Sequence, residues 1–135
     1  MGKWTDGAGS LVVPGEPAEV SLEVPLEVAA SYRARRRGLL GRDGVAGALL
    51  IVRTNSVHTF GMRFAIDVAY LDRSFRVLSV VTMRPGRLGM VRPRGRHVLE
   101  AEAGAMAGWG VRAGVRVRVE TGHSPGLTEG PTPGG

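Results

Sequence analysis

The segment Asp67-Val-Ala-Tyr-Leu-Asp72-Arg-Ser-Phe-Arg76-Val-Leu-Ser-Val-Val-Thr-Met-Arg84 decides the class of fold. Two apolar runs rich in β-forming residues, Asp67–Asp72 and Arg76–Arg84, flank the short polar stretch 72–75. Two such runs joined by a turn that contains Asp and Ser are typical of a β-hairpin. The segment therefore predicts two paired strands.

Further short strands are expected on both sides of this hairpin. Alternating apolar and polar residues predict a strand over Val20–Val28, and Pro25 favours an edge position because proline cannot donate to a ladder. Gly47–Val52 is an apolar run typical of a central strand, and His97–Glu102 is expected to form another. Residues 115–119 alternate as a closing strand. Several short strands separated by turns predict a mainly β domain, a sandwich or small barrel.

The pattern also predicts one short helix and two flexible ends. Ser31 can cap a helix that starts at Tyr32 and runs to about Leu40, with Gly38 and then Gly41 ending it. Residues 1–19 and 121–135 are rich in Gly and Pro and poor in large apolar side chains, so both are predicted to be flexible. The folded part is then a single β domain over residues 20–120.

Positive charge is the main compositional feature. Residues 20–120 contain 17 Arg and eight acidic residues, a balance of +9. The chain's single Lys indicates a codon habit that favours Arg, but the excess charge still attracts anionic partners. Arg33–Arg42 and Arg84–Arg96 each hold five Arg and no acid. If the fold brings them together, they form an anion surface whose candidate members are Arg33, Arg36, Arg42, Arg87, Arg92 and Arg94.

The composition argues against several classes of function. The chain has no Cys, so thiol nucleophiles, disulfides and thiolate metal sites are excluded. No basic, apolar leader opens the chain, and no stretch approaches the roughly 18 apolar residues of a membrane span. We therefore expect a cytoplasmic protein without membrane association. The spacing of the three His residues demands no metal site, and no phosphate loop or serine-hydrolase motif is present, so we expect neither metal nor cofactor.

The densest group of functional side chains is His58, Arg63 and Asp67, within ten residues. Arg63 and Asp67 would share a face if the segment is extended. A carboxylate at the mouth of a buried strand must be hydrogen-bonded or paired. Asp67 is therefore either a ligand-orienting acid or a structural carboxylate. Glu100, between Leu99 and Ala101, is expected to be half-buried and paired.

Four landmarks, in order, resemble the family known as domain of unknown function 192. They are Arg35-Arg-Arg-Gly38-Leu-Leu-Gly-Arg42, the apolar run Leu49–Val52, the segment Met62–Asp72, and Val98-Leu-Glu-Ala-Glu-Ala-Gly104 with Gly110 and Gly114. The resemblance covers about Val20 to Val119. It implies a mostly β, jelly-roll-like fold and supplies no activity. The chain departs from the family where Val57-His58-Thr59 replaces Phe-Trp-Met, Ala65 replaces Pro and Glu102 replaces Asn.

Three functions remain open at this point. The first is a binding module for a small polar or anionic ligand, in a pocket lined by Arg37, His58, Arg63, Asp67 and Glu100. The second is an interaction module in which the two Arg-rich segments dock an acidic protein or a nucleic acid. Nucleic acid is the weaker partner because aromatic side chains, on which bases stack, are scarce near these segments. The third is an enzyme in which Asp67 and His58 form an acid–base pair.

Overall fold

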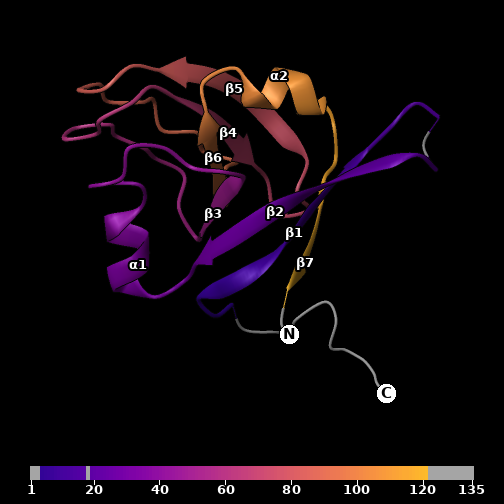
Figure 1. The fold of residues 1–135 in the computed structure, drawn as a ribbon, viewed down its shortest axis with the longest axis horizontal. Coiled ribbons are helices and arrows are strands. Elements are labelled where there is room, and N and C mark those ends of the chain that lie inside the picture. Colours follow the sequence, from indigo (N-terminus) through magenta and orange to yellow (C-terminus); the bar gives the residue numbers. More distant parts are fainter. Residues whose placement is uncertain (1–3, 18, 122–135) are drawn as a thin grey trace.

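The computed structural model describes residues 4–17 and 19–121, which form one mainly β domain, as predicted (Figure 1). Its strands belong to a seven-stranded sheet with the spatial order β5-β4-β6-β3-β2-β1-β7. In chain order the elements are β1 (Gly7–Pro14), β2 (Ser21–Ala29), α1 (Tyr32–Arg37), β3 (Ala48–Val52), β4 (Ile66–Leu71), β5 (Val77–Met83), β6 (His97–Glu102), α2 (Ala105–Trp109) and β7 (Arg118–Thr121).

The predicted hairpin is confirmed as β4 and β5, which pair in antiparallel register. Its turn is built by Asp72, whose Oδ1 accepts hydrogen bonds from the backbone N–H groups of Ser74 and Arg76 at 2.8 and 3.0 Å. This is how Asp side chains commonly fix turns. β3 and β6 complete the buried centre of the sheet, and every residue of β3 is buried.

The single parallel pair among the described strands, β2 with β3, requires a crossover connection, and α1 lies in it. Ser31 caps α1 as predicted, because its side chain accepts from the N–H of Ala34 at 3.1 Å. The helix ends at Arg37 rather than near Leu40, since Gly38 adopts a φ of 50°. A second short helix, α2, lies within residues 103–110, where the glycine-rich sequence predicts a turn or a single helical turn.

The sheet is open, not a closed barrel, although its two edges meet at one end. Val77 donates to Val115 O, and Gly114 donates to Val77 O, both at 2.8 Å. These bonds join the start of β5 to the segment leading into β7. The curled sheet therefore encloses one apolar core, while its other face carries a second core.

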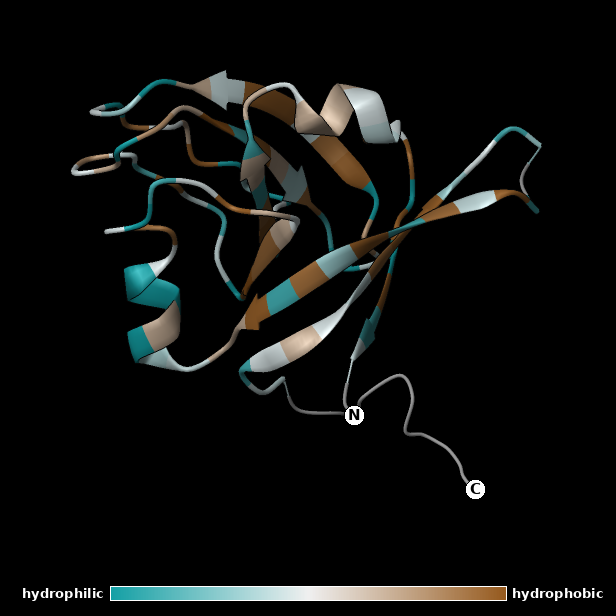
Figure 2. Ribbon diagram, viewed as in Figure 1, coloured by the Kyte–Doolittle hydropathy of each residue, from teal (hydrophilic) through white to brown (hydrophobic). Residues whose placement is uncertain are grey.

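Alternation along the strands divides the side chains between the two cores. Leu50 and Leu99 enter the first core, whereas Leu49 and Val98 enter the second. The second core lies beneath α1, and Leu39, which follows that helix, packs into it. Figure 2 shows the change of hydropathy from residue to residue along β2 and the mostly hydrophilic residues of α1.

The structure differs from the expectation of a flexible N-terminal segment. β1 lies within residues 1–19 and pairs with β2 over its full length. Leu11, Val12 and Val13 are buried there. This pairing places β2 inside the sheet, so the edge position inferred from Pro25 is wrong. Pro25 is tolerated because the pairing of β2 with β3 begins only at Leu26. The predicted flexible tail at 121–135 lies, after Thr121, outside the described residues.

No helix among the described residues is long and apolar enough to span a membrane.

Candidate ligand pocket

A pocket of about 210 Å³ lies over the second core, between α1 and the connection that follows β3. This volume suits a small ligand, because drug-sized ligands occupy pockets of roughly 300 to 1,000 Å³. Its wall is largely apolar and includes Leu39, Ile51 and Val57. Its polar lining includes Arg35, Arg36, Arg37, His58 and Glu100.

Glu100 comes from β6, where it pairs in register with Leu49 of β3 and Val68 of β4. Only 4% of its surface is exposed, although it lines the pocket. Among the hydrogen bonds and ion pairs of the described residues, none involves its carboxyl group. The expectation that Glu100 is half-buried and paired is therefore wrong on both counts.

Burial without a compensating charge raises the pKa of Glu100 to about 7. Near neutral pH the carboxyl therefore exchanges between two states of comparable population. When protonated, it offers an O–H donor as well as an acceptor, and when ionised it only accepts. Such an acid, shifted by burial and facing a cavity, is a feature more common at functional sites than elsewhere.

Three consecutive arginines of α1 line the pocket. Arg35 is partly ordered by a hydrogen bond from its Nη2 to Arg53 O at 2.9 Å, while its buried Nε has no partner among the described residues. Arg36 donates to the hydroxyl of Tyr32 at 3.1 Å. The side chain of Arg37 forms no hydrogen bond within the described structure. The pocket therefore combines an acid that is easily protonated with guanidinium groups that form no ion pair among the described residues, and such groups attract anions.

His58 also lines the pocket, but its side chain is exposed to solvent and is not part of the apolar wall. Its ring stacks on Phe60 at a centroid distance of 5.1 Å, and its Nδ1 accepts from the N–H of Phe60 at 3.3 Å. The histidine is therefore held in place without contacting a carboxylate. It can offer one further ring nitrogen to a ligand.

Arg63 and Asp67, the other two predicted pocket residues, are not brought to this pocket. Arg63 forms an exposed ion pair with Asp43 at 3.0 Å. Asp67 is 3% exposed, and its two oxygens accept from the Thr82 hydroxyl at 2.7 Å and from the N–H groups of Gly104 and Met106 at 2.9 and 3.1 Å. Those bonds tie β4 to β5 and to the start of α2, which is a structural role.

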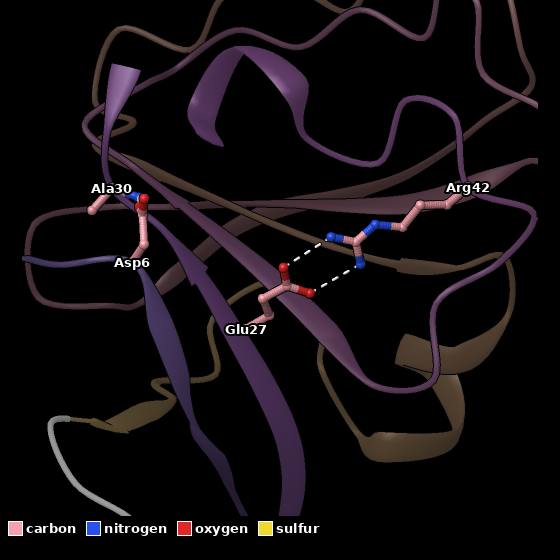
Figure 3. A network of polar contacts seen from close by, with 4 residues as sticks. All are labelled: Asp6, Glu27, Ala30 and Arg42. Atoms are coloured by element: carbon pink, nitrogen blue, oxygen red, sulfur yellow. Dashed lines mark hydrogen bonds and ion pairs between the residues drawn. The ribbon is translucent and has the colours of Figure 1, made fainter. Parts of the chain in front are cut away.

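The candidate anion surface is only partly available to a ligand. Arg42 forms a bidentate pair with Glu27, at 2.9 and 2.8 Å, which Figure 3 shows beside the Asp6–Ala30 contact. Its hydrogen bond lowers the pKa of Glu27. Arg92 lies over the ring of Tyr70, 5.3 Å from its centroid. Arg36 belongs to the pocket, and the exposed members that remain are Arg33, Arg87 and Arg94.

Asp6 fixes the start of α1 from a segment that the sequence analysis treated as flexible. Its Oδ1 accepts from the N–H of Ala30 at 2.6 Å (Figure 3). The same oxygen accepts from the N–H of Ser31 at 2.8 Å, and Oδ2 accepts from the Ser31 hydroxyl at 2.7 Å. These bonds lower the pKa of Asp6, with the Ser31 hydroxyl as the main cause. The pocket wall formed by α1 therefore depends on a residue far away in sequence.

The sequence did not identify every residue that lines the pocket, and it predicted two, Arg63 and Asp67, that do not line it. Arg35 and the apolar wall were not singled out, because no local motif marks side chains that meet only after the crossover has folded. The cluster of arginines in 33–42 was the available signal. Among the described residues, no group of three or more His, Asp or Glu side chains is placed to hold a metal ion.

Comparison with known proteins places the chain among uncharacterised relatives. UPF0127 protein PH1112 of Pyrococcus horikoshii is 32% identical over 98 residues, which cover 69% of this chain and 85% of that protein. UPF0127 protein PYRAB11210 of Pyrococcus abyssi is 30% identical over 98 residues, covering 69% and 84% of the two chains.

Two crystal structures share the fold. One, from Sinorhizobium meliloti 1021, is described as a presumed transcription regulator; it has a TM-score of 0.73 and 16% identity, and the match covers 87% of this chain and 98% of that one. The other, a protein of unknown function from Novosphingobium aromaticivorans, has a TM-score of 0.70 and 17% identity, with 81% and 83% covered. The family model described as Uncharacterized ACR matches residues 15–119. This chain therefore belongs to that family, domain of unknown function 192.

Proposed function

We propose that this protein is a binding module for a small polar or anionic ligand, held in the pocket between α1 and the connection after β3. The observation that carries the proposal is the carboxyl group of Glu100. It is almost fully buried, it lines the pocket, and no described residue neutralises it or hydrogen-bonds to it. A buried polar group without a partner destabilises a fold, and a ligand that supplies the partner would relieve that cost.

The charge around the pocket favours an anionic ligand. The guanidinium groups of Arg36 and Arg37 can form paired hydrogen bonds with a carboxylate or phosphate. Protonated Glu100 can donate a further hydrogen bond to an acceptor atom of the same ligand. The apolar wall would exclude water from these bonds, which strengthens them.

The pocket also unites two of the segments on which the family resemblance rests. Arg37-Gly38-Leu39 forms one wall, and Glu100 comes from the segment Val98–Gly104, about sixty residues later. The alternative of an Asp67–His58 acid–base pair has less support. Three hydrogen bonds already occupy the Asp67 carboxylate, and none of them comes from His58.

The test is the pH dependence of anion binding. If the anion binds only the protonated form of Glu100, its apparent affinity should fall about tenfold between pH 6 and pH 8, because the fraction of protein in that form falls by this factor. The probes are sulfate, acetate and lactate, whose charge is constant over this range. Binding is measured by calorimetry and by the rise in melting temperature.

A matched pair of variants separates the pocket from general electrostatics. Glu100→Gln keeps a hydrogen-bond donor but cannot ionise, so it should bind with an affinity that does not change over this pH range. Glu102→Gln, an exposed residue on the same strand, should behave like the wild type. Binding that is absent for every probe, or a pH profile that Glu100→Gln leaves unchanged, would contradict the proposal.

A further inference from the structure

Two connections form an ordered pair, here called the loop pair: residues 57–62, which border the candidate pocket through Val57, His58 and Met62, and residues 84–94. Thr59 joins them, because its N–H donates to Arg87 O at 2.7 Å and its carbonyl accepts from Gly86 N at 2.8 Å. Its fully buried hydroxyl donates to Arg84 O at 2.6 Å and accepts from Arg87 N at 2.8 Å. The loop pair is therefore a fixed platform.

This platform presents apolar side chains to solvent. Leu88 and Met90 are each 73% exposed, Val91 is 60% exposed and Phe60 is 50% exposed. They make up four of the seven large apolar side chains that are exposed in the described structure. Such clustering marks interaction sites, whereas single exposed apolar residues are ordinary.

The charge of the loop pair is entirely positive. Neither segment contains an acid, and Arg84, Arg87 and Arg94 are exposed. Their side chains take part in no ion pair among the described residues. A second copy of this chain would bring the same positive charge to the contact, so the platform does not favour self-association. It favours an anionic partner.

We propose that the loop pair docks onto the surface of an anionic lipid bilayer. Interleaved basic and apolar side chains have the chemistry of interfacial membrane binding, in which the apolar groups enter the boundary between headgroups and acyl chains while the arginines contact anionic headgroups. The four apolar side chains do not line the candidate pocket, and each is at least half exposed. A deformable bilayer accepts such projecting side chains without a complementary cavity.

The loop pair would dock on the surface of the bilayer and would not span it. Such docking revises the expectation of no membrane association, which rested on the lack of a spanning segment. The loop pair shares Val57, His58 and Met62 with the lining of the candidate pocket, but none of the side chains changed in the test below lines that pocket, so the two proposals can be tested separately.

The test is co-sedimentation of the full chain with phosphatidylcholine vesicles that contain phosphatidylglycerol, at a salt concentration of about 0.1 M. Binding is expected, with little or none to pure phosphatidylcholine vesicles. Leu88→Ser/Met90→Ser/Val91→Ser and, separately, Arg84→Gln/Arg87→Gln/Arg94→Gln should each weaken it on the order of tenfold or more. The controls are Val20→Ser/Leu22→Ser in β1–β2 and Arg33→Gln/Arg73→Gln/Arg112→Gln, which change exposed residues elsewhere and should leave binding within about twofold.

Three results would overturn the proposal. Failure to bind the anionic vesicles excludes the bilayer. An equal loss in the control arginine variant means that net charge alone causes adsorption. The third result is that the protein does not bind vesicles but is retained on immobilised polyglutamate, and that this retention requires the loop-pair arginines. The partner of the platform would then be an acidic protein. Circular dichroism of each variant confirms that a loss of binding is not a loss of fold.

Discussion

Replacing Asp67 with alanine is expected to lower the free energy of unfolding by about 1 to 3 kcal/mol. The carboxylate receives three hydrogen bonds, from the Thr82 hydroxyl and from the N–H groups of Gly104 and Met106. Alanine would leave the buried N–H of Met106 without an acceptor, whereas Thr82 and Gly104 are exposed and their donors can turn to water. Each buried donor left without an acceptor costs about 1 to 3 kcal/mol.

Urea unfolding at neutral pH measures this loss directly. Asp43→Ala is the control, because it removes an exposed carboxylate whose ion pair with Arg63 lies in solvent. Such surface pairs contribute about 0 to 1 kcal/mol. Equal, small effects of the two substitutions would contradict the structural role of Asp67. They would also reopen the interpretation of Asp67 as a ligand-binding acid.

Replacing Glu100 with glutamine is expected to stabilise the protein in alkaline solution. The pKa of Glu100 is raised in the folded state from its usual 4.5 to about 7, so the folded protein holds this proton more tightly than the unfolded chain. Stability therefore falls as the pH rises from 4.5 towards 7. Above that window the ionised, buried carboxylate costs about 3 kcal/mol, at 1.36 kcal/mol per unit of pKa shift. Glutamine carries no such penalty.

The informative quantity is the difference between the stability curves of the wild type and Glu100→Gln. It should be near zero at pH 4.5 and reach about 3 kcal/mol at pH 8. The subtraction cancels the effects of other titrating groups. One of these is His97: burial lowers its pKa, so its contribution to the stability of the fold decreases in acid. Glu102→Gln should show no comparable dependence on pH. A difference for Glu100→Gln that is constant with pH would show that this carboxyl is neutralised in the folded protein.

A protein that keeps Glu100 thus accepts a cost in stability near neutral pH. In this respect Glu100 differs from Asp67, the other buried carboxylate of the central strands. Asp67 is satisfied by its neighbours, so its burial is explained by the fold alone. The carboxyl of Glu100 has no such neighbours and faces a pocket, so the fold alone does not explain it. The contrast is what supports a ligand site at Glu100 rather than at Asp67.

Local periodicity was enough to predict the central strands. The hairpin of β4 and β5, the apolar β3 and the strand β6 follow from patterns within a few residues. β1 was missed because Gly7-Ala-Gly-Ser10 offers no large side chain, and only Leu11-Val-Val13 marked it. Its stability comes from pairing with β2 and β7, which no local pattern records.

The sequence predicted several residues of the candidate site, but it did not predict which side chains contact one another in the fold. Arg37, His58 and Glu100 were expected to share a pocket, and the structure brings these three together. Arg63 and Asp67 were expected with them because they are neighbours of His58 in sequence. The partners of Asp67 lie 37 and 39 residues later, at Gly104 and Met106, and only the three-dimensional fold reveals them.

The most direct test of the account is a nuclear magnetic resonance titration of the Glu100 side-chain carboxyl carbon in the free protein. Its assignment follows from the loss of that signal in Glu100→Gln. We expect a pKa of about 7, because the carboxyl is buried without a neutralising partner. A pKa near the usual value of 4.5 would mean that water or an arginine already neutralises this group, and would contradict the claim that it awaits a ligand.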